Sequence, residues 1–303
     1  MERIASTTVS AAVLADLTRS FENVQRSGEE LASGRLFSEP SQDPQAFARA
    51  AELRSTLGGL EEYAANIGYG TGFNRAAAGA LDSIGAALQK AREVITQAGS
   101  GIDNKQQLAS LAEVVEGLAE QVKVEADTQF GGQYVFAGTA VTTAPYAAGA
   151  EDAYRGNGEP VQIAIGKGIA VPLGADIERL LGQGTAAGDG KLLDVLRTAA
   201  TLLREGSPEA LERLRTTTLE GLSAAEANLV SLQTQVGTVV AQLEHAEASL
   251  EALRDTTQAA LAQNTEVDFA KVASEYAGQQ VAYEAALKTG AQLIQLSLLE
   301  FLG

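Results

Sequence analysis

Residues 222–250 read LSAAEANLVSLQTQVGTVVAQLEHAEASL and carry the longest regular apolar pattern in the chain. Their apolar residues recur in alternating steps of three and four, which keeps one narrow side of a helix turned toward a partner helix. A helix over this span would be roughly 40 Å long at 1.5 Å per residue. The fold is therefore predicted to be built on long helices packed side by side. The positions that form the stripe are Leu222, Ala225, Leu229, Leu232, Val236, Val239, Leu243, Ala246 and Leu250.

Both ends of the chain carry similar stripes, although chain ends are usually frayed and polar. The first runs through Leu14, Leu17, Phe21, Val24, Gly28 and Leu31 and stops at Ser33-Gly34. The last helix is apolar to its end, so both stripes should pair with each other or with copies of the chain. The predicted assembly seam sets Leu14, Leu17, Phe21, Val24 and Leu31 against Tyr276, Tyr283, Leu287, Ile294 and Leu298.

Between these ends, helical patterns give way to strand patterns and then return. One helical region is expected from about Gln45 to Ala98, interrupted at Gly58-Gly59 and at Gly68, Gly70 and Gly72, and another from Lys105 to Phe130. Gln133–Thr139, Val161–Ile165 and Ile169–Val171 mix β-branched, aromatic and alternating residues, as short strands do. Helix is expected again near Leu192, with a start at Ser207-Pro208-Glu209, and Thr265 with Asp268 suggests a capping box for the last helix.

The composition excludes several classes of protein. Ala and Leu dominate the apolar residues, aromatic residues make up 5%, and there are 6 Pro and no Trp, a mixture that favours long helices with thin cores. With no Cys, disulfides and thiolate metal sites are excluded. A net charge of −17 makes nucleic acid and anionic membrane surfaces poor partners. No apolar run approaches the roughly 20 residues that membrane insertion needs, and Val9–Ala15, stopped by Asp16, is no Sec signal peptide.

Residues suited to catalysis, cofactors or metals form no recognisable set. The single histidine, His245, lies within a helical stripe and has no second histidine to share a metal. Gly68-Tyr69-Gly70-Thr71-Gly72 lacks both a preceding strand and the nucleotide-binding spacing, so a helix break is expected there. We therefore predict no catalytic, cofactor-binding or metal site, and a protein that is not an enzyme.

Two motifs give the chain a family resemblance. Leu31–Leu36 (LASGRL) followed by Pro40–Pro44 (PSQDP) resembles the N-terminal signature of the flagellin superfamily in its hook-associated protein 3 form, with Gln42 in place of Asp. Asp127–Thr139 (DTQFGGQYVFAGT) and Thr142–Tyr146 (TTAPY) are similar to that family's middle block. The C-terminal helix is similar as well, at Asp268-Phe269, Gln279-Gln280, Leu287 and Ser297–Leu299.

This resemblance implies a secreted structural component of the bacterial flagellum. Members leave the cell unfolded through the flagellar type III export apparatus, and their terminal helices form the inner layer of the assembled structure. Implied partners are copies of the chain in a ring, hook-associated protein 1, flagellin, an export chaperone and the export apparatus, with no nucleic acid and no membrane insertion. An adaptor at the hook–filament junction is the main hypothesis, and a flagellin or minor flagellin is the alternative.

The fold class expected is mainly α and flagellin-like: a coiled-coil rod of N- and C-terminal segments with a small hairpin-containing middle. Five segments are predicted along the chain. They are an assembly segment at 1–40, the first part of a helical rod domain at 41–135, a β-rich outer region at 136–190, the second part of the rod domain at 191–264 and an assembly segment at 265–303.

Overall fold

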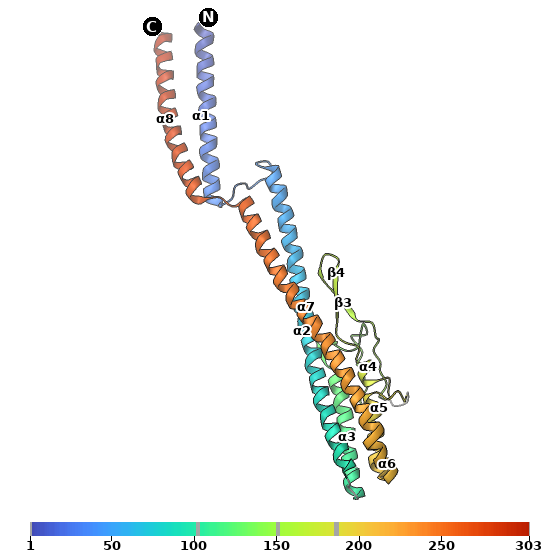
Figure 1. The fold of residues 1–303 in the computed structure, drawn as a ribbon. Coiled ribbons are helices and arrows are strands. Elements are labelled where there is room, and N and C mark those ends of the chain that lie inside the picture. Colours follow the sequence, from blue (N-terminus) through green and yellow to red (C-terminus); the bar gives the residue numbers. More distant parts are fainter. Residues whose placement is uncertain (1, 101–103, 150–151, 185–187, 303) are drawn as a thin grey trace. The chain divides into compact units, whose positions relative to one another are not determined.

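The computed structural model describes residues 2–100, 104–149, 152–184 and 188–302, with side chains described between 11 and 292. The chain divides into two compact units, one formed by residues up to Gly59 and from Leu253 on, the other by Leu60–Ala252. The mainly helical class with small hairpins in the middle is confirmed (Figure 1). The helices are α1 (Glu2–Ser33), α2 (Pro44–Gly99), α3 (Lys105–Ala126), α4 (Glu178–Leu181), α5 (Leu192–Glu205), α6 (Pro208–Arg213), a π-helical turn η2 (Leu214–Thr218), α7 (Leu219–Thr265) and α8 (Phe269–Leu302).

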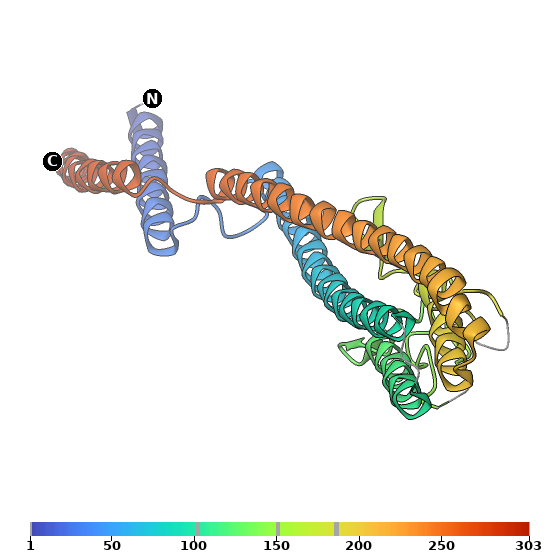
Figure 2. The same ribbon diagram turned by 60° about the horizontal axis from the view of Figure 1, so that its bottom comes forward.

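The unit Leu60–Ala252 has a core of helix side chains from α2, α3, α5 and α7. The stripe that the sequence predicts on α7 is buried from Leu222 to Leu243, which confirms its 3–4 spacing as the core-facing side. Ion pairs from Arg75 to Glu244 and from Arg92 to Glu226 join α2 to α7 along the edge of this contact. The strands and loops between α3 and α5 in the chain gather beside the helices (Figure 2).

Helix α2 runs without a break through the glycines that were expected to interrupt it. At Gly70 and Gly72 the prediction was wrong because both are places of close approach, whereas a Cβ on Gly58, Gly59 or Gly68 would meet nothing within 4 Å. A Cβ on Gly70 would lie 3.2 Å from Leu173 and 3.3 Å from Leu243, and one on Gly72 would overlap the Phe130 ring. Glycine costs about 1 kcal/mol in a helix, and the packing that it permits on both sides of α2 outweighs that cost.

The middle segment holds two small antiparallel hairpins, β1–β2 (Gln129–Phe130 with Gln133–Tyr134) and β3–β4 (Val161–Gly166 with Ile169–Leu173). The β3–β4 hairpin confirms the predicted strands; its inner face packs on Ile67, Val239 and Leu243. The predicted strand Gln133–Thr139 ends at Tyr134, and α3 ends at Ala126 and not at Phe130. Beyond Tyr134 the chain turns inward, and Val135, Phe136 and Ala137 are buried as loop residues.

Of the three helix ends that the sequence analysis predicted, two have the expected capping residue. Gly34 ends α1 with φ +69°, and Ser207 accepts a hydrogen bond from the Ala210 amide at the start of α6. For α8 the cap is Asp268, whose carboxylate accepts the amides of Ala270 and Lys271. Thr265 is the last residue of α7 and its hydroxyl donates to Leu261 O, so the expected capping box was wrong.

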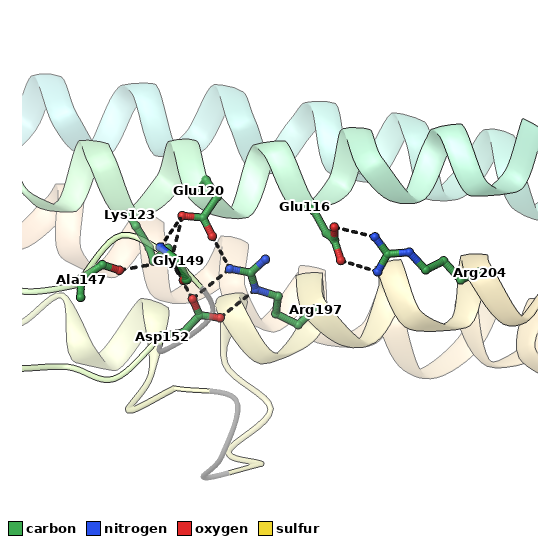
Figure 3. Close-up of polar contacts among 8 residues, drawn as sticks. All are labelled: Glu116, Glu120, Lys123, Ala147, Gly149, Asp152, Arg197 and Arg204. Atoms are coloured by element: carbon green, nitrogen blue, oxygen red, sulfur yellow. Dashed lines mark hydrogen bonds and ion pairs between the residues drawn. The ribbon is translucent and has the colours of Figure 1, made fainter.

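A buried ionic cluster ties the middle segment to the helices (Figure 3). Lys123 of α3 is only 2% exposed, and its ammonium contacts Asp152 Oδ1 at 2.8 Å, Glu120 Oε2 at 3.0 Å and the carbonyls of Ala147 and Gly149. Arg197 of α5 donates two hydrogen bonds to the fully buried Asp152 carboxylate, at 2.8 and 3.0 Å, and a third to Glu120. Two cations and two carboxylates balance within this cluster, so each of its four charged groups has a partner of opposite sign.

Asp152→Asn should destabilise this unit strongly, because two buried cations would then share one carboxylate. Breaking a buried pair costs about 3–5 kcal/mol, and equilibrium denaturant unfolding of the full chain would measure it. Glu226→Gln is the matched control: its half-exposed pair with Arg92 should be worth less than about 1 kcal/mol. Equal losses in the two variants would contradict a special role for the cluster.

The same cluster predicts acid lability. Burial opposes ionisation of Asp152, but hydrogen bonds from Arg197 and Lys123 outweigh it and hold its pKa below the ordinary value. The pKa of Glu120 is lowered in the same way. This stability is present above the unfolded-state pKa of about 4 and is lost as the pH falls through the folded-state pKa.

Burial raises the pKa of Asp127 and Asp176, which acts in the opposite sense, so the measurement should compare wild type with Asp152→Asn. Between pH 6 and pH 3 the denaturation midpoint of the wild type should fall further than that of the variant. Parallel midpoint curves would contradict the assignment.

Candidate assembly interface

The two terminal helices form an antiparallel pair whose inner faces repeat every seven residues (Figure 1). On each helix the less exposed positions alternate steps of three and four, the spacing of a coiled-coil seam. The seam of α1 consists of Val13, Leu17, Ser20, Val24, Ser27 and Leu31, and that of α8 consists of Val272, Tyr276, Gln279, Tyr283, Ala286 and Gly290.

Large side chains of one helix lie on glycines of the other. A Cβ on Gly28 would lie 3.3 Å from the Tyr276 ring, and one on Gly290 would lie 3.1 Å from Val13 Cγ1. The Phe21 and Tyr283 rings contact at 5.7 Å between centroids. These contacts occur at separate points along the pair, so the two backbones approach each other over several turns.

One buried polar contact interrupts the apolar seam. Ser27 is 5% exposed, and its hydroxyl donates a hydrogen bond of 2.9 Å to Gln279 Oε1. A buried hydroxyl or amide without a hydrogen-bond partner costs free energy. The contact avoids this cost for the Ser27 hydroxyl and for the Gln279 amide oxygen.

A short stretch of paired backbone holds the adjoining ends of α1 and α8. The Leu36 amide donates to Thr265 O at 2.9 Å, and the Val267 amide donates to Gly34 O at 3.2 Å. We call these two segments, residues 34–37 and 265–267, the neck. Its apolar anchor is Phe37, which is buried with its ring 6.1 Å from Phe47.

The PSQDP motif forms the turn that leads from the neck into α2. Asp43 caps α2 by accepting the amides of Gln45 and Ala46, and Pro44 occupies the first helical position. Gln42 Oε1 accepts the Ser38 amide at 2.6 Å and the Glu39 amide at 3.3 Å, so glutamine serves as the acceptor that closes this loop.

Beside the seam, several apolar side chains remain in water. Leu14 is 58% exposed and Phe21 and Leu287 are each 44% exposed, although all three flank seam positions. Val281 and Phe269 of α8 are exposed as well. Burial of one Leu or Phe side chain is worth roughly 1.5–3 kcal/mol. This flanking set is therefore a surface that gains free energy when another helix covers it.

The predicted seam residues separate into three groups in the structure. Leu17, Val24, Leu31, Tyr276 and Tyr283 lie in the seam between α1 and α8. Leu14, Phe21 and Leu287 belong to the exposed flanking set. The side chains of Ile294 and Leu298 lie outside the described residues.

Sequence reasoning missed half of the α1 seam by one residue. The stripe had followed Leu14 and Phe21, whereas the structure turns Val13 and Ser20 inward. Farther along, Ser27 lies inward beside the predicted Gly28, which contacts Tyr276. On α8 the sequence reasoning missed Gln279, Ala286 and Gly290. The seven-residue spacing of Tyr276 and Tyr283 was the available signal. The small and polar residues at the other seam positions do not stand out in a hydrophobic pattern, so they could not be recognised from it.

Outside the terminal helices, three features that the sequence raised can be located in the described chain. Among residues with described positions, no group of three or more acidic or histidine side chains is placed to hold a metal ion. His245 is exposed on α7. No helix in the described ranges is both long enough and apolar enough to cross a membrane.

Asp43→Ala should loosen the first turn of α2, because two amides lose their acceptor. A lost cap costs about 1 kcal/mol, so hydrogen exchange at Gln45 and Ala46 should accelerate about fivefold. Asp255→Ala, on an exposed side of α7, is the matched control and should leave exchange in α2 unchanged. Unchanged exchange in Asp43→Ala would contradict the capping role of the motif.

Comparison with known proteins places both halves of this interface in one family. The chain matches the bacterial flagellin N-terminal helical region over residues 4–141 and the bacterial flagellin C-terminal helical region over residues 219–302. It is 26% identical to the flagellar hook-associated protein 3 of Escherichia coli, with 94% of each chain covered. It is 25% identical to the flagellin of Bacillus subtilis, with 89% of each covered.

Solved structures share the fold. The structure described as a putative flagellar hook-associated protein from Vibrio parahaemolyticus is similar with a TM-score of 0.66 at 18% identity. The similarity covers 74% of this chain and 100% of that one.

Proposed function

Because this chain belongs to the bacterial flagellin family, a family of structural proteins and not of enzymes, we propose that it is an adaptor subunit at the junction between flagellar hook and filament. The observation that carries the proposal is the apolar flanking set on the paired terminal helices. A monomer has no use for such a surface, whereas a ring of copies would cover it.

The choice of the junction within the family rests on two supports. The similarity to the hook-associated protein 3 of Escherichia coli extends over almost the whole of both chains. The turn into α2 also keeps the Pro-Ser-x-Asp-Pro form of that branch, and both Gln42 and Asp43 in it accept backbone amides.

In this proposal the flanking residues Leu14, Phe21 and Leu287 pack against the terminal helices of neighbouring copies in a ring. The ring would contact hook-associated protein 1 on the hook side and flagellin on the filament side. The chain would reach this place through the flagellar export apparatus with the help of an export chaperone. No polymer of this chain alone is needed, because a single layer suffices to join two different polymers.

A flagellin that polymerises into the filament is the second candidate. It is favoured by the similarity to the Bacillus subtilis flagellin, which covers 89% of each chain at nearly the same identity. The two candidates differ in what remains when the chain is missing.

Deletion of the gene distinguishes these candidates. We expect cells with hooks but no filaments, and flagellin monomers in the medium, because the filament would have no attachment layer. Electron microscopy of the cells and immunoblots of the medium would measure both. Persisting filaments would favour a minor flagellin, and missing hooks would contradict a place beyond the hook.

Phe21→Asp should fail to restore filaments in the deletion strain. A carboxylate at this half-exposed position would be desolvated in the assembled ring, with nothing in the pair α1–α8 to compensate it. Asn23→Asp adds the same charge at an exposed position of the same turn and should restore filaments. Secreted amounts of both variants should match, so that loss of export is not mistaken for loss of assembly. Normal filaments with Phe21→Asp would contradict the role of the flanking set.

A further inference from the structure

The seam between α1 and α8 has a repeat that permits more than one alignment. Leu17, Val24 and Leu31 are aliphatic residues of similar shape, seven residues apart. Sliding α1 by seven residues, about 10 Å, would replace each of them by its neighbour in the repeat. Apolar contact alone therefore distinguishes poorly between the native alignment and a slipped one.

We propose that Ser27 with Gln279, and Gly28 with Tyr276, are the residues that select one register for the terminal helices. The hydrogen bond joins two seam positions that face each other in only one alignment. Next to it, the absence of a side chain on Gly28 makes room for the Tyr276 ring. Polar residues at a seam specify register in this way, at a cost in stability.

A slip of one repeat breaks both contacts in either direction. In one direction Ser27 would face Val272 and lose its partner, whereas Gln279 would face Ser20, a second serine of the seam. Tyr276 would then meet Phe21, so discrimination against this slip rests on the unpaired Ser27 and on the crowding of the two rings. In the other, Gln279 would face Gly34 and Tyr276 would meet Arg35, beyond the end of α1. Each slip thus leaves a buried polar group without a partner, or sets the tyrosine ring against a large side chain.

The register also decides which surface the pair presents to neighbours. In the native alignment the Phe21 ring leans on Tyr283 while 44% of it stays exposed. A slip would separate these rings and move Leu14 and Phe21 relative to Leu287 by seven residues. This consequence for the junction rests on the proposed function, whereas the register itself is a property of the single chain.

The neck is the competing explanation, because its backbone hydrogen bonds also hold the end of the pair. The double variant Ser27→Leu/Gln279→Leu distinguishes selection of the register by the polar pair from selection by the neck. It leaves the neck intact and makes the seam fully apolar at this level. If the polar pair selects the register, the double variant should be more helical and more heat-stable than wild type, yet mixed in register. Gln279→Leu alone should be less stable than wild type, because Ser27 would lose its acceptor.

Engineered disulfides can report the register, since the chain has no cysteine of its own. Ser20→Cys/Ala286→Cys reports the native register, because this pair lies one repeat from Ser27 and Gln279. Val13→Cys/Ala286→Cys reports a slip of one repeat. Each cysteine pair would be placed in the purified full chain with and without the double leucine substitution. Oxidation would be followed by gel mobility, and circular dichroism would confirm that each variant is helical.

In the wild-type background we expect at least tenfold more cross-linking from the native reporter than from the slip reporter. In the double leucine background the slip reporter should rise to a level comparable with the native one. A slip reporter that stays silent there would overturn the proposal and assign the register to the neck. Cross-linking by the slip reporter at a level comparable with the native reporter in the wild-type background would overturn it as well. The assay needs no other flagellar protein, so it stands apart from the deletion experiment that tests the junction role.

Discussion

The apolar side chains at both ends of the chain are the constraint on which the rest of this structure depends. Exposure of apolar side chains on α1 and α8 to water costs free energy, and pairing of the two helices removes only part of this cost. The seam is buried, but Leu14, Phe21 and Leu287 stay substantially exposed. Pairing of the two chain ends thus leaves apolar surface exposed, which the proposed assembly would bury.

Polar groups in this protein restrict the arrangement of helices that apolar contact alone would leave loose. In the seam, Ser27 and Gln279 satisfy each other at one level. In the unit Leu60–Ala252, Asp152 draws a loop onto α3 and α5 through Lys123 and Arg197. Both arrangements bury polar or charged groups at a desolvation cost, and both pair residues at defined positions of the packed helices.

Glycines also restrict the arrangement of the helices, because they allow close approach only at particular positions. In α2, Gly70 and Gly72 admit Leu243, Leu173 and Phe130, and the helix continues because packing compensates for its weaker local propensity. Thin helical cores made of Ala and Leu depend on such close approach, since they have few bulky side chains with which to fill space.

The sequence by itself determined the helical class, the stripe on α7, the β3–β4 hairpin and the family, because hydrophobic period, turn residues and motifs are written locally. It determined the period of the α1 seam but not the phase of its alternate positions: Phe21 is more hydrophobic than Ser20, yet Ser20 is the residue turned inward. Only the tertiary structure decided that phase, the continuity of α2 through its glycines and the burial of Asp152. Each of these features depends on contacts with residues far away in the sequence. The free energy of those contacts exceeds the local conformational preference of the residues concerned.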